Sequence, residues 1–94
     1  MYGMIEKINE QISVITIYNR DKGTVLPWKV RWNGRDYTIT KLGYHYRVKR
    51  GMFTHHIFTV SNATIAFKLL FDTESLYWWV QEVPGTLVFQ PILR

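Results

Sequence analysis

The fold is decided by one stretch, Lys29-Val30-Arg31-Trp32-Asn33-Gly34-Arg35-Asp36-Tyr37-Thr38-Ile39-Thr40. At its centre, Asn33-Gly34 suits a type I′ turn, because both central positions need a positive φ and these residue types tolerate it best. A two-residue loop then places Trp32 opposite Arg35, and each earlier residue opposite the corresponding later one. The stretch therefore predicts a β-hairpin with a defined register.

Residue alternation gives the two faces of this hairpin different chemistry, because successive side chains of a strand point to opposite sides. One face is apolar and holds Trp28, Val30, Trp32, Tyr37 and Ile39. The other is polar and holds Lys29, Arg31, Asp36, Thr38 and Thr40. Arg31 and Asp36 lie opposite each other, an ion pair worth ~0.2–1 kcal/mol. We expect the apolar face to pack on a core.

Short strands separated by turn residues continue along the chain. The pattern predicts strands at 11–18, 24–32, 35–48, 53–60, 63–71 and 76–83, with a short terminal one at 86–89. Residues 1–10 place Met4 and Ile8 at helical spacing and predict a short helical or irregular lead-in. We expect one all-β domain over 1–94, with the lead-in at 1–10, an antiparallel meander at 11–83 and a tail at 84–94. The meander has five or six strands and forms a curled sheet or a partly closed small barrel.

The predicted strand 35–48 changes its inward parity part-way along. Tyr37 and Ile39 are odd-numbered, whereas the later apolar residues Leu42, Tyr44, Tyr46 and Val48 are even-numbered. A bulge between 41 and 43 reconciles the two sets, and Gly43 suits such a bulge. With the even residues inward, His45, Arg47 and Lys49 face outward.

Composition restricts the class of protein. The chain has 94 residues, 47% of them hydrophobic and 16% aromatic, and no cysteine. The lack of cysteine excludes disulfides and thiolate chemistry, and no apolar run reaches the ~18–20 residues that span a bilayer. With no signal-peptide pattern at the start, we expect a cytoplasmic protein without membrane contact.

Catalytic, metal and cofactor motifs are absent from the sequence. Of the three histidines, the adjacent His55 and His56 must point to opposite faces of a strand, so one face offers at most two imidazoles. Zinc needs three or four converging ligands. No serine lies in a glycine-framed elbow, and the glycines form no phosphate-binding pattern. We expect no enzyme, cofactor or metal.

The positive charge is concentrated in the middle of the chain. The net charge is +5, and residues 29–68 hold eight basic residues against one acid, Asp36. A positive sheet face with nearby aromatic residues can hold phosphates and stack bases. We predict non-specific nucleic-acid binding through a face made of Lys29, Arg31, Arg47, Lys49 and Arg50. The alternative interpretation is a solvated face that discourages edge pairing.

A second candidate surface lies at 76–83, which is apolar on both faces. In one interpretation, the terminal segments cover Tyr77, Trp79 and Val83. In the other they form an exposed patch, with the C-terminal tail, for a partner protein or a homodimer.

Residues 11–83 resemble a family of small, functionally uncharacterised bacterial domains. The resemblance rests on a W-x-G-R-x-Y hairpin at 32–37, on Phe67-Lys68-Leu69-Leu70-Phe71-Asp72 and on Trp78-Trp79-Val80. This sequence differs from the family at 47–56, where the family carries more tryptophan and arginine. Some members of that family lie beside Y-family, lesion-bypass DNA polymerases. The resemblance implies an all-β accessory domain, with no catalytic residues, that contacts nucleic acid or a nucleic-acid-processing enzyme.

Overall fold

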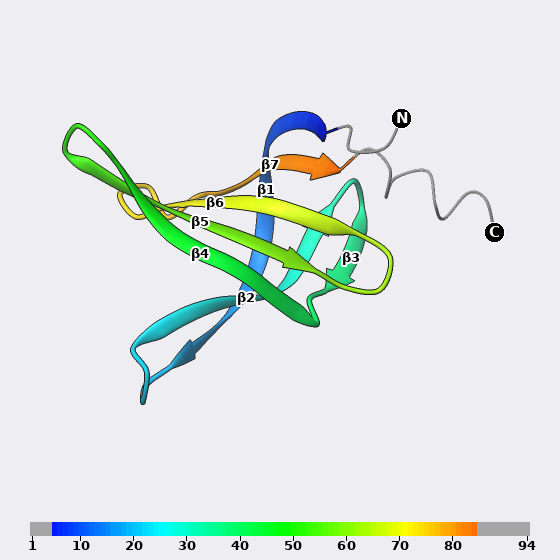
Figure 1. The fold of residues 1–94 in the computed structure, drawn as a ribbon, viewed down its shortest axis with the longest axis horizontal. Coiled ribbons are helices and arrows are strands. Elements are labelled where there is room, and N and C mark those ends of the chain that lie inside the picture. The colour runs from blue at the N-terminus through cyan, green and yellow to red at the C-terminus, as the bar shows by residue number, and fades with distance from the viewer. Residues whose placement is uncertain (1–4, 85–94) are drawn as a thin grey trace.

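A computed structural model describes residues 5–84, which form one antiparallel sheet of seven strands that curls into a half-barrel (Figure 1). Across the sheet, the strand order is β3-β2-β1-β7-β6-β5-β4. The strands are β1 (Ile5–Asn19), β2 (Thr24–Trp32), β3 (Arg35–Thr38), β4 (Lys41–Arg50), β5 (Phe53–Ser61), β6 (Ala66–Asp72) and β7 (Trp78–Pro84). The predicted all-β class and curled antiparallel sheet are confirmed. The described residues contain no helix, and so none that could cross a membrane.

The hairpin at 29–40 has the predicted turn and register. Asn33 and Gly34 have φ values of 54° and 74°, as a type I′ turn requires. Trp32 pairs with Arg35, and Arg31 pairs with Asp36. The Arg31 Nε donates to Asp36 Oδ1 over 2.8 Å, and its second guanidinium nitrogen reaches Oδ2 over 3.2 Å. Local turn chemistry and alternation were therefore enough to specify this hairpin.

The prediction of five or six strands was wrong because the stretch at 35–48 is two strands. Ile39 and Thr40 form a corner between β3 and β4. The Ile39 N–H donates to the Trp28 carbonyl over 2.8 Å, and the Thr40 N–H donates to the Ser61 carbonyl over 3.0 Å. These two hydrogen bonds join β2 to β5 through the corner. The chain thus bends where the curled sheet brings its two ends toward each other.

The helical lead-in was also wrong within residues 5–10, because these residues begin β1. β1 is 15 residues long and pairs with β7 through its first half and with β2 through its second half. Asn9 has a φ of 51°, where the register with β7 shifts. A residue in the left-handed region within an irregular pairing is typical of a β-bulge. Residues 1–4 and the predicted strand at 86–89 lie outside the described residues.

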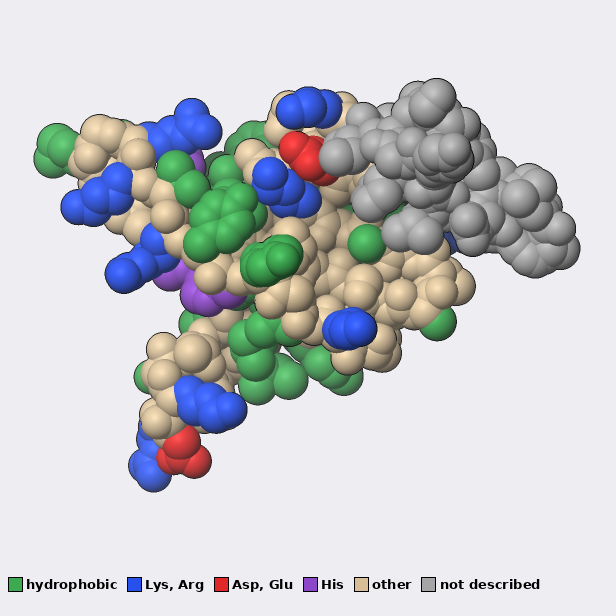
Figure 2. All heavy atoms as spheres, viewed as in Figure 1, with side chains coloured by type: hydrophobic (Ala, Val, Ile, Leu, Met, Phe, Trp, Pro, Cys, Tyr) green, Lys and Arg blue, Asp and Glu red, His purple; other side chains and the backbone are tan. Residues whose placement is uncertain are grey.

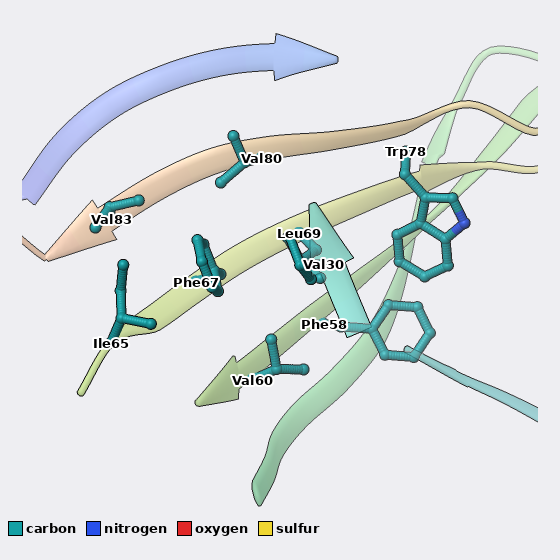
Figure 3. Packing of buried hydrophobic residues seen from close by; sticks show 9 residues of the cluster. All are labelled: Val30, Phe58, Val60, Ile65, Phe67, Leu69, Trp78, Val80 and Val83. Carbon is teal, nitrogen blue, oxygen red and sulfur yellow. The ribbon is translucent and has the colours of Figure 1, made fainter. Parts of the chain in front are cut away.

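The core lies on the face of the sheet that the curl encloses, called the inner face below; the opposite face is the outer face. The core is formed by Val30, Phe58, Val60, Ile65, Phe67, Leu69, Trp78, Val80 and Val83. Figure 3 shows Val30 of β2 among the side chains of this cluster, and the Phe58 ring next to the Trp78 indole. Trp32, Tyr37 and Ile39 pack against this cluster, as predicted for the apolar face of the hairpin, whereas Trp28 of the same predicted face is 42% exposed. Burial of one such side chain contributes about 1.5–3 kcal/mol.

Candidate nucleic-acid interface

The orientation of β4 is set by a bulge at Gly43. Leu42 pairs with Val60 and His45 pairs with Phe58, so two residues of β4, Gly43 and Tyr44, lie opposite one residue of β5. The Tyr44 N–H donates to the Thr59 Oγ1 over 2.6 Å. A Cβ on Gly43 would overlap that same hydroxyl oxygen. A glycine is therefore required where β4 passes closest to Thr59.

This bulge reverses the predicted parity of β4. The predicted bulge exists, but it lies after Leu42. Leu42 therefore faces the inner side with its partner Val60, and beyond the bulge the odd-numbered residues of β4 face the inner side. His45 pairs with Phe58 and Arg47 pairs with His56, on the face that carries the core. Tyr46 pairs with Ile57 on the outer face. The prediction that His45, Arg47 and Lys49 face outward was therefore wrong.

The five cations of the predicted face lie on different strands and faces. Lys29 and Arg31 are on β2, and Arg47, Lys49 and Arg50 are on β4, with β1, β7, β6 and β5 between them in the sheet. Arg31 is held by Asp36, and the Lys29 ammonium lies 5.1 Å from the centre of the Trp28 ring. The curled sheet thus divides the predicted basic face into two separate groups.

The second group lies on a projecting hairpin. The hairpin formed by β4 and β5 extends beyond the rest of the sheet, at the upper left of Figure 1. Figure 2 shows Lys and Arg side chains gathered on its end, with no acidic side chain among them in this view. Within residues 5–84, Arg47, Lys49 and Arg50 make no ion pair. We call these three residues the hairpin cations.

Exposed aromatic side chains accompany the hairpin cations. Tyr44 is 75% exposed, and Phe53 and Tyr46 are each exposed to nearly half of their surface. Arg50 pairs with Phe53 at the end of the hairpin. The hairpin therefore combines free positive charge with aromatic surface, the two elements that hold single-stranded nucleic acids.

Two imidazoles meet on the inner side of the same hairpin. The His45 Nε2 lies 2.8 Å from the His56 Nδ1, and the His45 ring stacks on Phe58 with 4.2 Å between the ring centres. Burial, and then the charge of Arg47, lower the pKa of His45 below its ordinary value. Burial lowers the pKa of His56 as well, with smaller contributions from His45 and Arg47. This pair prefers the neutral state.

Sequence reasoning missed this pair because it assigned the wrong parity to β4. The signal that locates it is the turn Gly51-Met52. Counting back from this two-residue turn pairs Arg50 with Phe53, Arg47 with His56 and His45 with Phe58.

The third histidine, His55, lies on the outer face. Its Nε2 is 3.7 Å from the Asp72 Oδ1. Two hydrogen bonds lower the pKa of Asp72. The larger effect comes from the Glu74 N–H and the smaller one from the Ser75 hydroxyl. In the described part of the chain, no three His, Asp or Glu side chains gather as metal ligands would.

The predicted interaction patch is only partly exposed. Val83 is fully buried in the core, because the register between β6 and β7 shifts after Val80 and turns Val83 to the inner face. Tyr77 is 52% exposed and Trp79 is half-buried. Val83 therefore does not belong to a surface patch, and the C-terminal tail lies outside the described residues.

Comparisons with family models, curated proteins and solved structures found no match to this chain.

Proposed function

We propose that this protein is a non-catalytic accessory module that binds single-stranded nucleic acid without sequence preference. The observation that carries the proposal is the group of hairpin cations Arg47, Lys49 and Arg50, which lie on an edge strand and make no ion pair within residues 5–84. Phosphates are held by such cations, and the released counterions supply much of the affinity. Tyr44, Tyr46 and Phe53 offer surfaces on which bases stack.

The position of β4 supports this assignment. An edge strand has no neighbour on one side, so side chains from both of its faces can reach a ligand that lies along the edge. Arg47 and Lys49 reach it from the inner face and Arg50 from the outer face.

A salt titration of binding to a fluorescently labelled single-stranded oligonucleotide tests the proposal. If each hairpin cation neutralises one phosphate, log K falls with log salt by about 0.7 per contact, giving a slope of about −2.1. The Arg47→Ala/Lys49→Ala variant is expected to reduce the slope to about −0.7. Its melting temperature stays close to that of the parent, because exposed side chains contribute little to stability.

The matched control is Lys29→Ala/Arg31→Ala, which removes the same charge from β2. We expect this control to keep the parental slope, because these cations are not free for phosphates. Equal loss of slope in both variants would show that net charge alone drives binding. Absence of parental binding at low salt would instead favour the protein-interaction alternative, centred on Tyr77 and Trp79.

A further inference from the structure

We infer that the free edge of β4 is a docking site for an extended, acidic segment of another protein, which adds to the sheet as a further strand. β4 is ten residues long and contains no proline. It ends the sheet, and no strand in residues 5–84 pairs with its outer edge. Only Val48 among its residues is half-buried; the others are exposed. Such an edge presents unpaired main-chain donors and acceptors to a passing strand.

The turn of the hairpin identifies which main-chain groups are free. Gly51 has a φ of 61° and begins a two-residue turn between Arg50 and Phe53. In such a hairpin the pair that flanks the turn exchanges hydrogen bonds, and such pairs alternate with pairs that do not. The register is regular from Arg50 back to His45. The N–H and C=O groups of His45, Arg47 and Lys49 therefore face the free edge.

The side chains along this edge select the chemistry of the added strand. His45, Arg47 and Lys49 line its inner side, and Tyr46 and Val48 line its outer side. A strand pairing here would place alternate residues beside cations and the others beside apolar groups. The complementary segment alternates Asp or Glu with apolar residues.

A second copy of this chain does not fit the same edge. Pairing of two β4 strands would place Arg47 and Lys49 of each copy beside the cations of the other, and like charges across a strand pair are destabilising. Cations on an edge strand are one way in which proteins prevent self-association. The same charges that exclude a second copy attract an acidic partner.

The test uses the intact protein and a fluorescein-labelled peptide in which Glu alternates with Val. Arg47→Ala and Arg47→Pro both remove the charge, but only the proline removes the main-chain donor that faces the edge. We expect Arg47→Ala to weaken peptide binding about threefold to tenfold. Arg47→Pro is expected to weaken it about tenfold further, since the proline also blocks close pairing of a strand.

The same two variants separate this inference from nucleic-acid binding, on which it does not depend. Both should weaken oligonucleotide binding equally, because phosphates respond to the lost charge. Equal peptide affinities for Arg47→Ala and Arg47→Pro would overturn strand addition, as would binding of a Lys-Val peptide with the affinity of the Glu-Val peptide.

Hydrogen exchange in the unmodified protein provides a second test, which does not require the Arg47→Pro variant to fold. On peptide binding, the amides of Arg47 and Lys49 should gain protection. Those of Tyr46 and Val48 face β5 and should change little. Unchanged exchange at Arg47 and Lys49 with saturating peptide would contradict the inference.

Discussion

At the scale of single residues, two glycines serve the fold for different physical reasons. Gly34 has a φ of 74°, and an added Cβ would meet no atom within 4 Å. Its role is purely conformational, since L-residues with side chains avoid this region. Gly43 does not have a positive φ but lies against Thr59, so its role is steric.

Replacing Gly34 with valine tests the first role. A β-branched residue at positive φ is disfavoured, and comparable strain costs about 1–3 kcal/mol. We expect Gly34→Val to lower the free energy of unfolding by about that amount in urea denaturation. Gly34→Asn is the control, because asparagine tolerates the left-handed region, and its loss should be clearly smaller. Equal losses in the two variants would mean that turn conformation is not the cause.

Replacing Gly43 with alanine tests the second role. The new methyl group overlaps the Thr59 hydroxyl, and overpacking of this kind typically costs about 1–3 kcal/mol. In the Gly43→Ala/Thr59→Ala double variant the hydroxyl is gone, so part of that loss should be recovered. A double-mutant cycle measures this coupling, which is expected to exceed about 0.5 kcal/mol. Strictly additive effects would indicate that Gly43 is needed for another reason.

At the scale of elements, irregular pairing decides which side chains each strand presents. The bulge at Gly43 directs Arg47 to the inner side, and the register shift in β7 buries Val83. One extra residue in a strand exchanges the faces of everything that follows it. The position of the bulge in β4 therefore decides which side chains the candidate interface presents on each face.

Engineered disulfides test directly which face of the sheet the Arg47 side chain lies on, because the chain has no cysteine of its own to interfere. Arg47 and His56 are directly opposed and share a face, at a spacing that a disulfide accommodates. We expect Arg47→Cys/His56→Cys to oxidise to an intramolecular disulfide. The control Arg47→Cys/His55→Cys, with side chains on opposite faces, should remain reduced. Mass spectrometry after mild oxidation detects the difference, and preferential closure of the control would reverse our assignment of faces.

At the scale of the whole molecule, aromatic contacts join β2 and β3 to β6 across the inner face of the curled sheet. Trp32 of β2 and Tyr37 of β3 both meet Phe67 of β6 edge-on, with ring centres 5.8 and 5.3 Å apart. The Trp32 indole N–H also donates to the Glu10 carboxylate over 2.6 Å. Such aromatic pairs contribute about 0.5–1.5 kcal/mol beyond their burial. Side chains therefore stabilise the curl of the half-barrel, as does the corner at 39–40.

The stacked pair of imidazoles, His45 and His56, makes stability depend on pH. Because the pKa values of His45 and His56 are lowered in the folded state, the unfolded chain binds more protons near their ordinary value of 6.5. Their contribution is fully present above this value and is lost as the pH falls through it toward the lowered values. We expect the melting temperature to fall between pH 7.5 and pH 5.5.

The variant His45→Phe keeps a ring that can stack on Phe58 but cannot take up a proton. In this variant the fall in melting temperature over the same pH range should be smaller, with the remainder due to His56. A fall as steep as that of the parent would show that other groups govern the pH dependence.

The sequence by itself determined the hairpin at 29–40, its turn type, its register and the face that packs on the core. These features follow from two residues at the turn and from alternation beside them, all of which are local. It also indicated the all-β class and the positive charge of the middle segment.

Only the tertiary structure decided which face carries Arg47 and where Lys29 lies relative to it. The phase of the bulge in β4 depends on the contact of Gly43 with Thr59, and no local pattern contains that contact. Likewise, β2 and β4 are close in sequence but are separated by four strands in the sheet, because β1 and β7 pair between them. The cations of β2 and those of β4 therefore lie on different parts of the sheet, although they share one stretch of sequence.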